Sequence, residues 1–122
     1  MSTGAQAYAR AVQVSAPARE IEAQALLKAA RQLQEVQSNW GKVDHKSIEA
    51  ALRFNRQLWT IFLTAAQSDE NPQPLEVRQK IANIGIFVMN RTVEMQLEPE
   101  PKKLSSLIEI NRNIAAGLSG RA

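Results

Sequence analysis

The feature that most constrains the fold of this chain is the spacing of its apolar residues, which return every three or four positions along nearly the whole sequence. This spacing gathers apolar side chains on one side of an α-helix, whereas a half-buried strand needs strict alternation of apolar and polar residues. No stretch of the chain shows such alternation. The sequence therefore predicts an all-α protein.

Proline and glycine mark where the helices begin and end. Pro17 suits a first helical position, Gly41 suits a helix end, and two proline-containing loops around residues 69–74 and 98–101 separate the later segments. We expect a single domain over residues 1–122, a compact bundle of four principal helices plus a short N-terminal helix. The short helix is expected over residues 5–12, and the principal helices over residues 17–40, 44–68, 74–97 and 102–118.

A further pattern concerns how the helices are grouped. At a constant offset of 56 positions, Ile48 aligns with Leu104, and Asn55 aligns with Asn111. This match is compatible with two helical hairpins of like pattern packed together. Heptad-like sequences align easily at many offsets, so the match is only weak support for a common ancestry of the two hairpins.

The dipeptide Asn-Arg occurs at 55–56, 90–91 and 111–112. Asn55 and Asn111 fall inside apolar stripes of their predicted helices, whereas Asn90 falls on a polar strip. An asparagine inside an apolar stripe needs hydrogen-bond partners, because an unsatisfied buried amide costs about 1–3 kcal/mol. Two interpretations stay open. In the first, the two amides bond to each other, to a helix end or to a loop carbonyl and fix helix register. In the second, they face a groove and bond to a partner's backbone.

The second interpretation gives a candidate contact region for a partner protein. In it, the asparagines would bond to backbone or amide groups, arginines at the groove edge would clamp a carboxylate, and a tryptophan would serve as an anchor. The candidate residues are Asn55, Arg56, Trp59, Asn111 and Arg112.

Catalytic and metal-binding groups are scarce. The chain has no cysteine and a single histidine, His45, expected to be exposed in the first turn after Asp44. Five glycines form no phosphate-binding loop, and the carboxylate pairs lie at helix starts or in loops, where they suit the helix dipole. We therefore expect no enzymatic activity, no cofactor and no metal.

Apolar run length and net charge indicate where the protein acts and what it could bind. No apolar run has the length of a signal peptide or of a membrane-spanning helix, so we expect a cytoplasmic protein without membrane insertion. The formal net charge is +3, and this surplus sits at the end of the chain, where Lys102, Lys103, Arg112 and Arg121 face only Glu109. This basic segment is the one feature that favours RNA binding.

Two helices have more apolar surface than one core needs. The apolar arc of the 44–68 helix covers about 200°, wider than a surface helix requires. The 74–97 helix has a second apolar face formed by Ala82, Ile86, Met89 and Val93. Such faces can form a groove for another helix, or they can be buried between two copies of the chain.

The chain resembles the FlaF family of flagellar biosynthesis regulators from alphaproteobacteria over nearly its whole length. The resemblance rests on Tyr8 and on the order and spacing of four runs, which are PAREIEAQALLKAARQL at 17–33, ALRFNRQLWTIF at 51–62, IANIGIFVMNRT at 81–92 and LIEINRNIAAGL at 107–118.

The resemblance implies a flagellum biogenesis factor that promotes or regulates flagellin synthesis and secretion alongside an FlbT-type regulator. It looks like a chaperone-like protein with flagellin as partner, since flagellin ends are long amphipathic helices that stay disordered before assembly. The alternative is an RNA-binding post-transcriptional regulator of flagellin mRNA. The oligomeric state stays open.

Overall fold

The computed structural model describes residues 3–120, with side chains described for residues 18–120. This part of the chain is helical and has no strand, which confirms the all-α bundle of four principal helices. The helices are α1 (Thr3–Ser38), α2 (His45–Gln67), α3 (Leu75–Leu97) and α4 (Leu104–Leu118), and a short 3-10 turn, η1 (Pro101–Lys103), leads into α4.

The N-terminal region differs from the expectation of a separate short helix. Residues 5–12 belong to the first turns of α1, which continues through Pro17 without a break. A proline inside a helix removes one backbone hydrogen bond, and here the helix is not ended by that loss. The side chains of residues 1–17 lie outside the described part of the structure.

The helix ends follow from local side-chain chemistry. Asp44 caps α2, because its carboxylate accepts a 2.8 Å hydrogen bond from the backbone nitrogen of Ser47. After α2, the side-chain amide of Asn71 donates to the Ala65 carbonyl at 2.9 Å, and its oxygen accepts from the Gln73 backbone nitrogen at 2.9 Å. This asparagine therefore satisfies an orphan carbonyl of α2 and shapes the loop that leads into α3.

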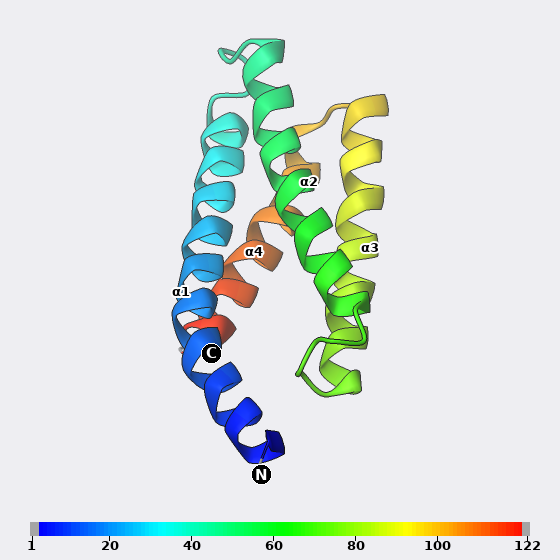
Figure 1. Cartoon of the computed structure of the whole chain (residues 1–122). Helices are drawn as coiled ribbons and strands as arrows, with labels where there is room; N and C mark the ends of the chain where they lie inside the picture. The colour runs from blue at the N-terminus through cyan, green and yellow to red at the C-terminus, as the bar shows by residue number, and fades with distance from the viewer. Residues whose placement is uncertain (1–2, 121–122) are drawn as a thin grey trace.

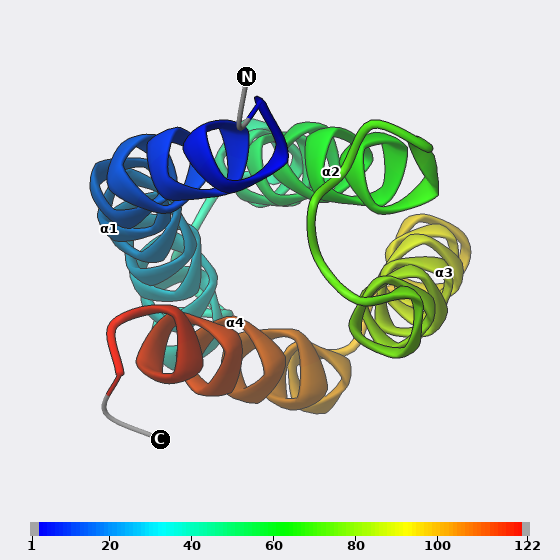
Figure 2. The same ribbon diagram turned by 60° about the horizontal axis from the view of Figure 1, so that its bottom comes forward.

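The four helices lie around a common centre (Figures 1 and 2). The closest pairs are α1 with α4 and α2 with α3, and α1 also packs on α2. The α1–α4 pair is antiparallel, since Gln37 near the end of α1 bonds to Ser105 at the start of α4 at 2.8 Å. At the other end of the pair, Ser119 bonds to Glu20 at 3.4 Å.

The sequence led us to expect that α3 and α4 would form a second packed hairpin. They do not, because these two helices make little contact. The buried stripe of α3 faces α2, where Gly85 lets the two helices approach closely. A Cβ at Gly85 would lie 3.4 Å from Leu63 Cδ1 and 3.6 Å from Trp59 Cε3. In α4, the stripe from Leu104 to Ala115 is buried mainly against α1. The apolar stripes of α3 and α4 were predicted correctly, but the stripes did not specify which helix covers them.

Side chains from all four helices meet in one core. Each large aliphatic or aromatic side chain that is fully buried stabilises the fold by about 1.5–3 kcal/mol relative to its exposed state. The largest such apolar side chains are Trp59, Leu26, Leu33, Met95, Leu104, Leu107 and Val88. This core supports both the buried polar network and the cavity that form the candidate site.

Candidate partner-binding site

A line of hydrogen bonds crosses the core from α2 to α4. The indole Nε1 of Trp59 donates to Oδ1 of Asn111 at 2.8 Å, and Nδ2 of Asn111 donates to Oδ1 of Asn55 at 2.7 Å. All three side chains are 0% exposed. An indole nitrogen can only donate, so it fixes the orientation of the Asn111 amide, and that amide in turn fixes Asn55. The network therefore has one direction, from Trp59 to Asn55.

The position of this network bears on the two interpretations of the asparagines. Asn55 and Asn111 are fully buried and bonded to each other, as the core interpretation expects. Contact of Asn55, Trp59 or Asn111 with a partner stays a prediction. Within the described residues, Nδ2 of Asn55 has no hydrogen-bond partner. The sequence could not decide between core and groove, because an asparagine in an apolar stripe looks the same in both.

The two arginines of the expected contact region are exposed and lie apart from the buried network. Arg56 is on the outer side of α2, and Arg112 on α4 donates to Oε1 of Gln34 on α1 at 3.3 Å. Their role in binding a partner stays a prediction. The third Asn-Arg pair follows the expectation, since Asn90 is exposed on α3.

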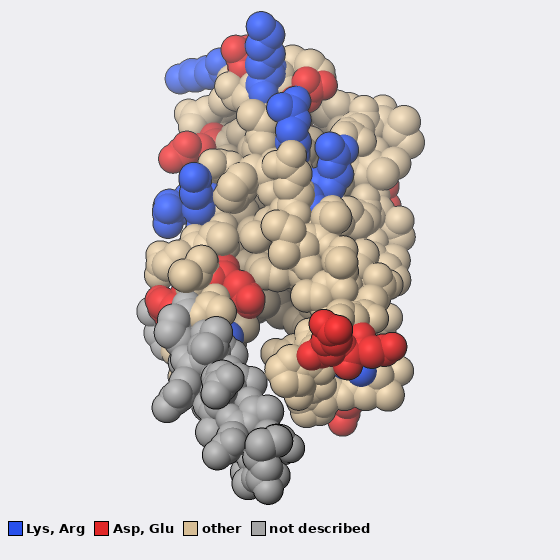
Figure 3. Space-filling view, viewed as in Figure 1, with Lys and Arg blue, Asp and Glu red and all other residues tan. Residues whose placement is uncertain are grey.

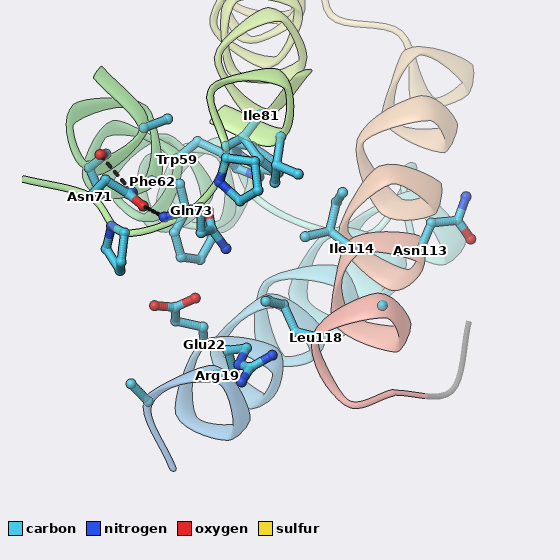
Figure 4. A pocket seen from close by; sticks show the side chains of 17 residues that line it. Arg19, Glu22, Trp59, Phe62, Asn71, Gln73, Ile81, Asn113, Ile114 and Leu118 are labelled. Atoms are coloured by element: carbon cyan, nitrogen blue, oxygen red, sulfur yellow. Dashed lines mark hydrogen bonds between the residues drawn. The ribbon is translucent and has the colours of Figure 1, made fainter. Parts of the chain in front are cut away.

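A cavity of about 630 Å³ lies at the end of the bundle where α3 begins and α2 and α4 end, beside Ala18, Arg19 and Glu22 of α1 (Figure 4). Its walls are mostly apolar and come from all four helices and from the α2–α3 loop. Small residues at the helix ends, Ala65, Ala66 and Gly117, leave space that larger side chains would fill. The larger apolar side chains that border it are Phe62, Val77, Ile81, Ile114 and Leu118.

The buried network supports a wall of this cavity from behind. Trp59 borders the cavity and packs against Phe62 in an edge-on arrangement, with ring centroids 5.4 Å apart and planes at 85°. The hydrogen bond to Asn111 holds the indole in place, and the indole holds the Phe62 ring. Asn111 and Asn55 therefore act on the cavity through Trp59, without reaching its surface.

Polar side chains stand on two sides of the cavity. Arg19 and Glu22 project from α1, opposite Asn71 and Gln73 of the α2–α3 loop (Figure 4). Partial burial raises the pKa of Glu22 above its usual value, and the positive charge of Arg19 offsets part of this rise. Because the Glu22 side chain is half-buried, a cationic group brought into the cavity would stabilise its ionised form.

The sequence reasoning missed this cavity. Its boundaries depend on the loop over residues 71–74, and on which helix ends meet, and neither follows from helical periodicity. One signal was present in the sequence. Two groups of small residues lie close to the ends of helices that otherwise carry bulky apolar side chains. They are Ala65 and Ala66 in α2 and residues 115–117 in α4.

A second apolar surface, the α3 strip, lies on the outside of the bundle. The expected second face of this helix is exposed, with Ile86 at 49% and Val93 at 50% exposure, and Ala82 and Met89 half-buried. Helical spacing adds one residue at each end of the helix. The complete α3 strip consists of Leu75, Ala82, Ile86, Met89, Val93 and Leu97.

Other features named from the sequence have ordinary surroundings. His45 is exposed, as expected, and its Nε2 lies 3.1 Å from a carboxylate oxygen of Glu49. In the basic segment, Lys102 lies 3.9 Å from Glu100 and Lys103 lies 3.8 Å from Glu98. Two of the cations that favoured RNA binding therefore have acidic neighbours. Across the part of the chain that the structure describes, no three potential metal ligands come together, and no helix has the length and apolar character needed to cross a membrane.

Together, the fold and the site define a small helical bundle with an open apolar end. Comparison with known protein families is consistent with the resemblance noted in the sequence, since the model of the family described as flagellar protein FlaF matches residues 4–118. The chain therefore belongs to the FlaF family and has a flagellum-related role. Searches of curated proteins and of solved structures gave no match.

Proposed function

We propose that this protein is a cytoplasmic flagellum biogenesis factor that binds flagellin in a chaperone-like manner and promotes or regulates flagellin synthesis and secretion. The observation that carries the proposal is the apolar cavity of about 630 Å³ at the bundle end of a flagellar family member. Its volume falls within the range typical of ligand pockets, about 300–1,000 Å³. No catalytic role is part of this proposal.

An amphipathic helix is the ligand class that fits this cavity. Such a helix inserts apolar side chains spaced by three or four positions into a hydrophobic groove. Phe62, Ile114 and Leu118 come from two different helices and would contact these side chains. The amide groups of Asn71 and Gln73 on the loop side could bond to polar groups at the edge of the bound helix.

Binding here would also protect the partner. The amphipathic ends of unassembled flagellin cannot bury their apolar faces alone and remain disordered. A preformed cavity lowers the entropic cost of capturing such a segment, because the walls are already ordered. The network from Trp59 to Asn55 supplies that order at the inner wall.

The first test is size-exclusion chromatography with light scattering, on the protein alone and mixed with monomeric flagellin, followed by calorimetric titration. A stoichiometric complex is the expected result. No complex at any mixing ratio, for a flagellin shown to be monomeric and a folded protein, would overturn the proposal.

Variants then locate the site. Gly117→Leu and Ala65→Trp place larger side chains in the cavity, from α4 and α2, and so fill part of it. A Cβ at Gly117 meets no atom within 4 Å, so the fold is expected to persist. We expect each to weaken flagellin binding by about tenfold or more. Ala50→Trp places the same large side chain at an exposed alanine of α2 outside the cavity. That control should bind like the wild type.

A further inference from the structure

The side of the molecule formed by α2 and α3 has an unusual distribution of charge. In Figure 3, most basic side chains of this face lie over its upper part, with acidic side chains among them, and a group of acidic side chains lies over its lower end beside a basic one. Arg53 and Arg56 are exposed on α2, and Asp69 and Glu70 are exposed in the α2–α3 loop. Among the described residues, none of these four side chains has an ion-pair partner.

The two charged groups lie at opposite ends of the α3 strip. Arg53 and Arg56 line a small depression of about 130 Å³ together with Glu49, Leu52 and Gln96, and Gln96 precedes Leu97 at the C-terminal end of the strip. The carboxylate of Glu49 lies 3.1 Å from Nε2 of His45, so the two arginines outnumber the acidic groups in the depression. Asp69 and Glu70 lie in the loop that leads to Leu75, where the strip begins. The helix between these ends has 23 residues and is about 35 Å long.

We propose that two copies of the chain associate through their α3 strips, in an antiparallel arrangement related by a two-fold axis. This arrangement buries the apolar middle of both strips. At each end it places the arginines of one copy beside the acidic loop of the other, so the same attraction occurs twice. A parallel arrangement would instead bring like charges together at both ends.

Exposure of the strip supports an interface of this kind. Leu75, Ile86, Val93 and Leu97 are 59%, 49%, 50% and 81% exposed, which is unusual for large apolar side chains in a row along one helix. The footprint of a single helix, about 35 Å by 10 Å, is small compared with stable interfaces. We therefore expect a dimer that dissociates on dilution in the micromolar range, about 10⁻⁶ to 10⁻⁴ M.

Sedimentation velocity over about a hundredfold range of concentration measures this association directly. The wild-type chain is expected to shift from monomer towards dimer. Val93→Glu, which puts a charge in the middle of the strip, should keep the chain monomeric. The control is Ile61→Glu, because Ile61 is 65% exposed but lies on the side of α2 away from α3, and this variant should still dimerise.

Charge exchange tests the antiparallel arrangement. One variant combines Arg53→Glu with Arg56→Glu, and the other combines Asp69→Lys with Glu70→Lys. Each alone places like charges at both ends of the dimer, so each should dimerise at least about tenfold more weakly than the wild type. In an equal mixture, both ends of a mixed dimer have opposite charges, and association should return to near the wild-type level.

Two results would overturn the proposal. One is a wild-type chain that stays monomeric throughout the concentration range. The other is a mixture of the exchanged variants that associates no better than either alone. Val93→Glu could instead weaken flagellin binding and show the same average mass in sedimentation as the wild type. In that case the strip belongs to the flagellin site and the proposed dimer is wrong.

Discussion

At the scale of single residues, the most informative feature is the buried line from Trp59 through Asn111 to Asn55. Burying a polar side chain is unfavourable unless its hydrogen bonds are made. Here the order of donors and acceptors allows one arrangement of the two amides. The network therefore links α2 to α4, two helices that are not among the closely packed pairs.

Asn111→Leu should be strongly destabilising, because it leaves the Trp59 donor and the Asn55 amide without partners in the core. We expect the free energy of unfolding in urea to fall by about 2–4 kcal/mol. Asn90→Leu is the matched control, since Asn90 is in the same Asn-Arg context but is exposed. Equal stability of the two variants would show that the network contributes nothing.

Glu22 makes the stability depend on pH in a defined direction. Its pKa is raised in the folded protein, mainly by burial, so the folded state disfavours the ionised form. The resulting loss of stability is absent below the usual pKa of 4.5, and it develops as the pH rises through the folded-state value.

Glu22→Gln should therefore melt at a higher temperature than the wild type at pH 7, with the difference shrinking towards pH 4. Thermal unfolding followed by circular dichroism at several pH values measures this effect. A variant that is less stable than the wild type at pH 7 would show that the carboxylate has a favourable partner in the folded state.

Residue types in the sequence allowed part of this picture to be predicted. Both asparagines were correctly placed inside apolar stripes, and hydrogen bonding between them was one of the two interpretations. The bond from Trp59 could not be foreseen, because helical periodicity gives the direction of a side chain but not the residue across the core. The cavity was missed for the same reason.

At the scale of helices, the boundaries of α2, α3 and α4 were predictable, whereas the start of α1 and the neighbours of each helix were not. Asp44, Pro74 and the segment 98–101 have local effects on the backbone, so they fix where helices begin and end regardless of the rest of the fold. The choice of α2 as the main neighbour of α3 depends on shape, including the close approach at Gly85. Shape complementarity between helices far apart in the sequence cannot be read from either helix alone.

The start of α2 provides a second pH-dependent prediction, of opposite sign. The hydrogen bonds from Ser47 lower the pKa of Asp44, so its carboxylate stabilises the folded state at pH values above its usual pKa of 3.8. This contribution is lost as the pH falls through the lower folded-state value.

Asp44→Ala should therefore lower the melting temperature at pH 7, and the difference from the wild type should decrease in acid. Asp44→Ser keeps a capping oxygen without a charge, so it should be less destabilising than Asp44→Ala and show no titration of its own. If both variants melted alike, the cap would not contribute to the start of α2.

At the scale of the whole molecule, two apolar surfaces lie in different places and have different chemistry. The cavity is bordered by all four helices at one end, and the α3 strip is an exposed surface on one helix. Their separation would permit the proposed binding of flagellin and of a second copy of the chain at the same time. Arg56 lines the depression at the C-terminal end of the strip, and Arg112 lines neither that depression nor the cavity.

The two surfaces should respond independently to substitution. Val93→Glu is expected to abolish self-association and leave the affinity for flagellin within about twofold of the wild type. Gly117→Leu should do the reverse. Calorimetry and sedimentation on the same preparations check both variants. A variant that lost both properties while staying folded would show that the two sites are coupled.

The weak contact between α3 and α4 has a consequence for how the molecule moves. Since α3 is held mainly by α2, it can separate from the bundle while α1 and α4 stay paired. Amide protons of α3 should therefore exchange with solvent deuterium earlier than those of α1 and α4, which mass spectrometry can follow. Because Val77 and Ile81 form one wall of the cavity, each such excursion would also widen its opening, so a bulkier guest could enter than the resting structure admits.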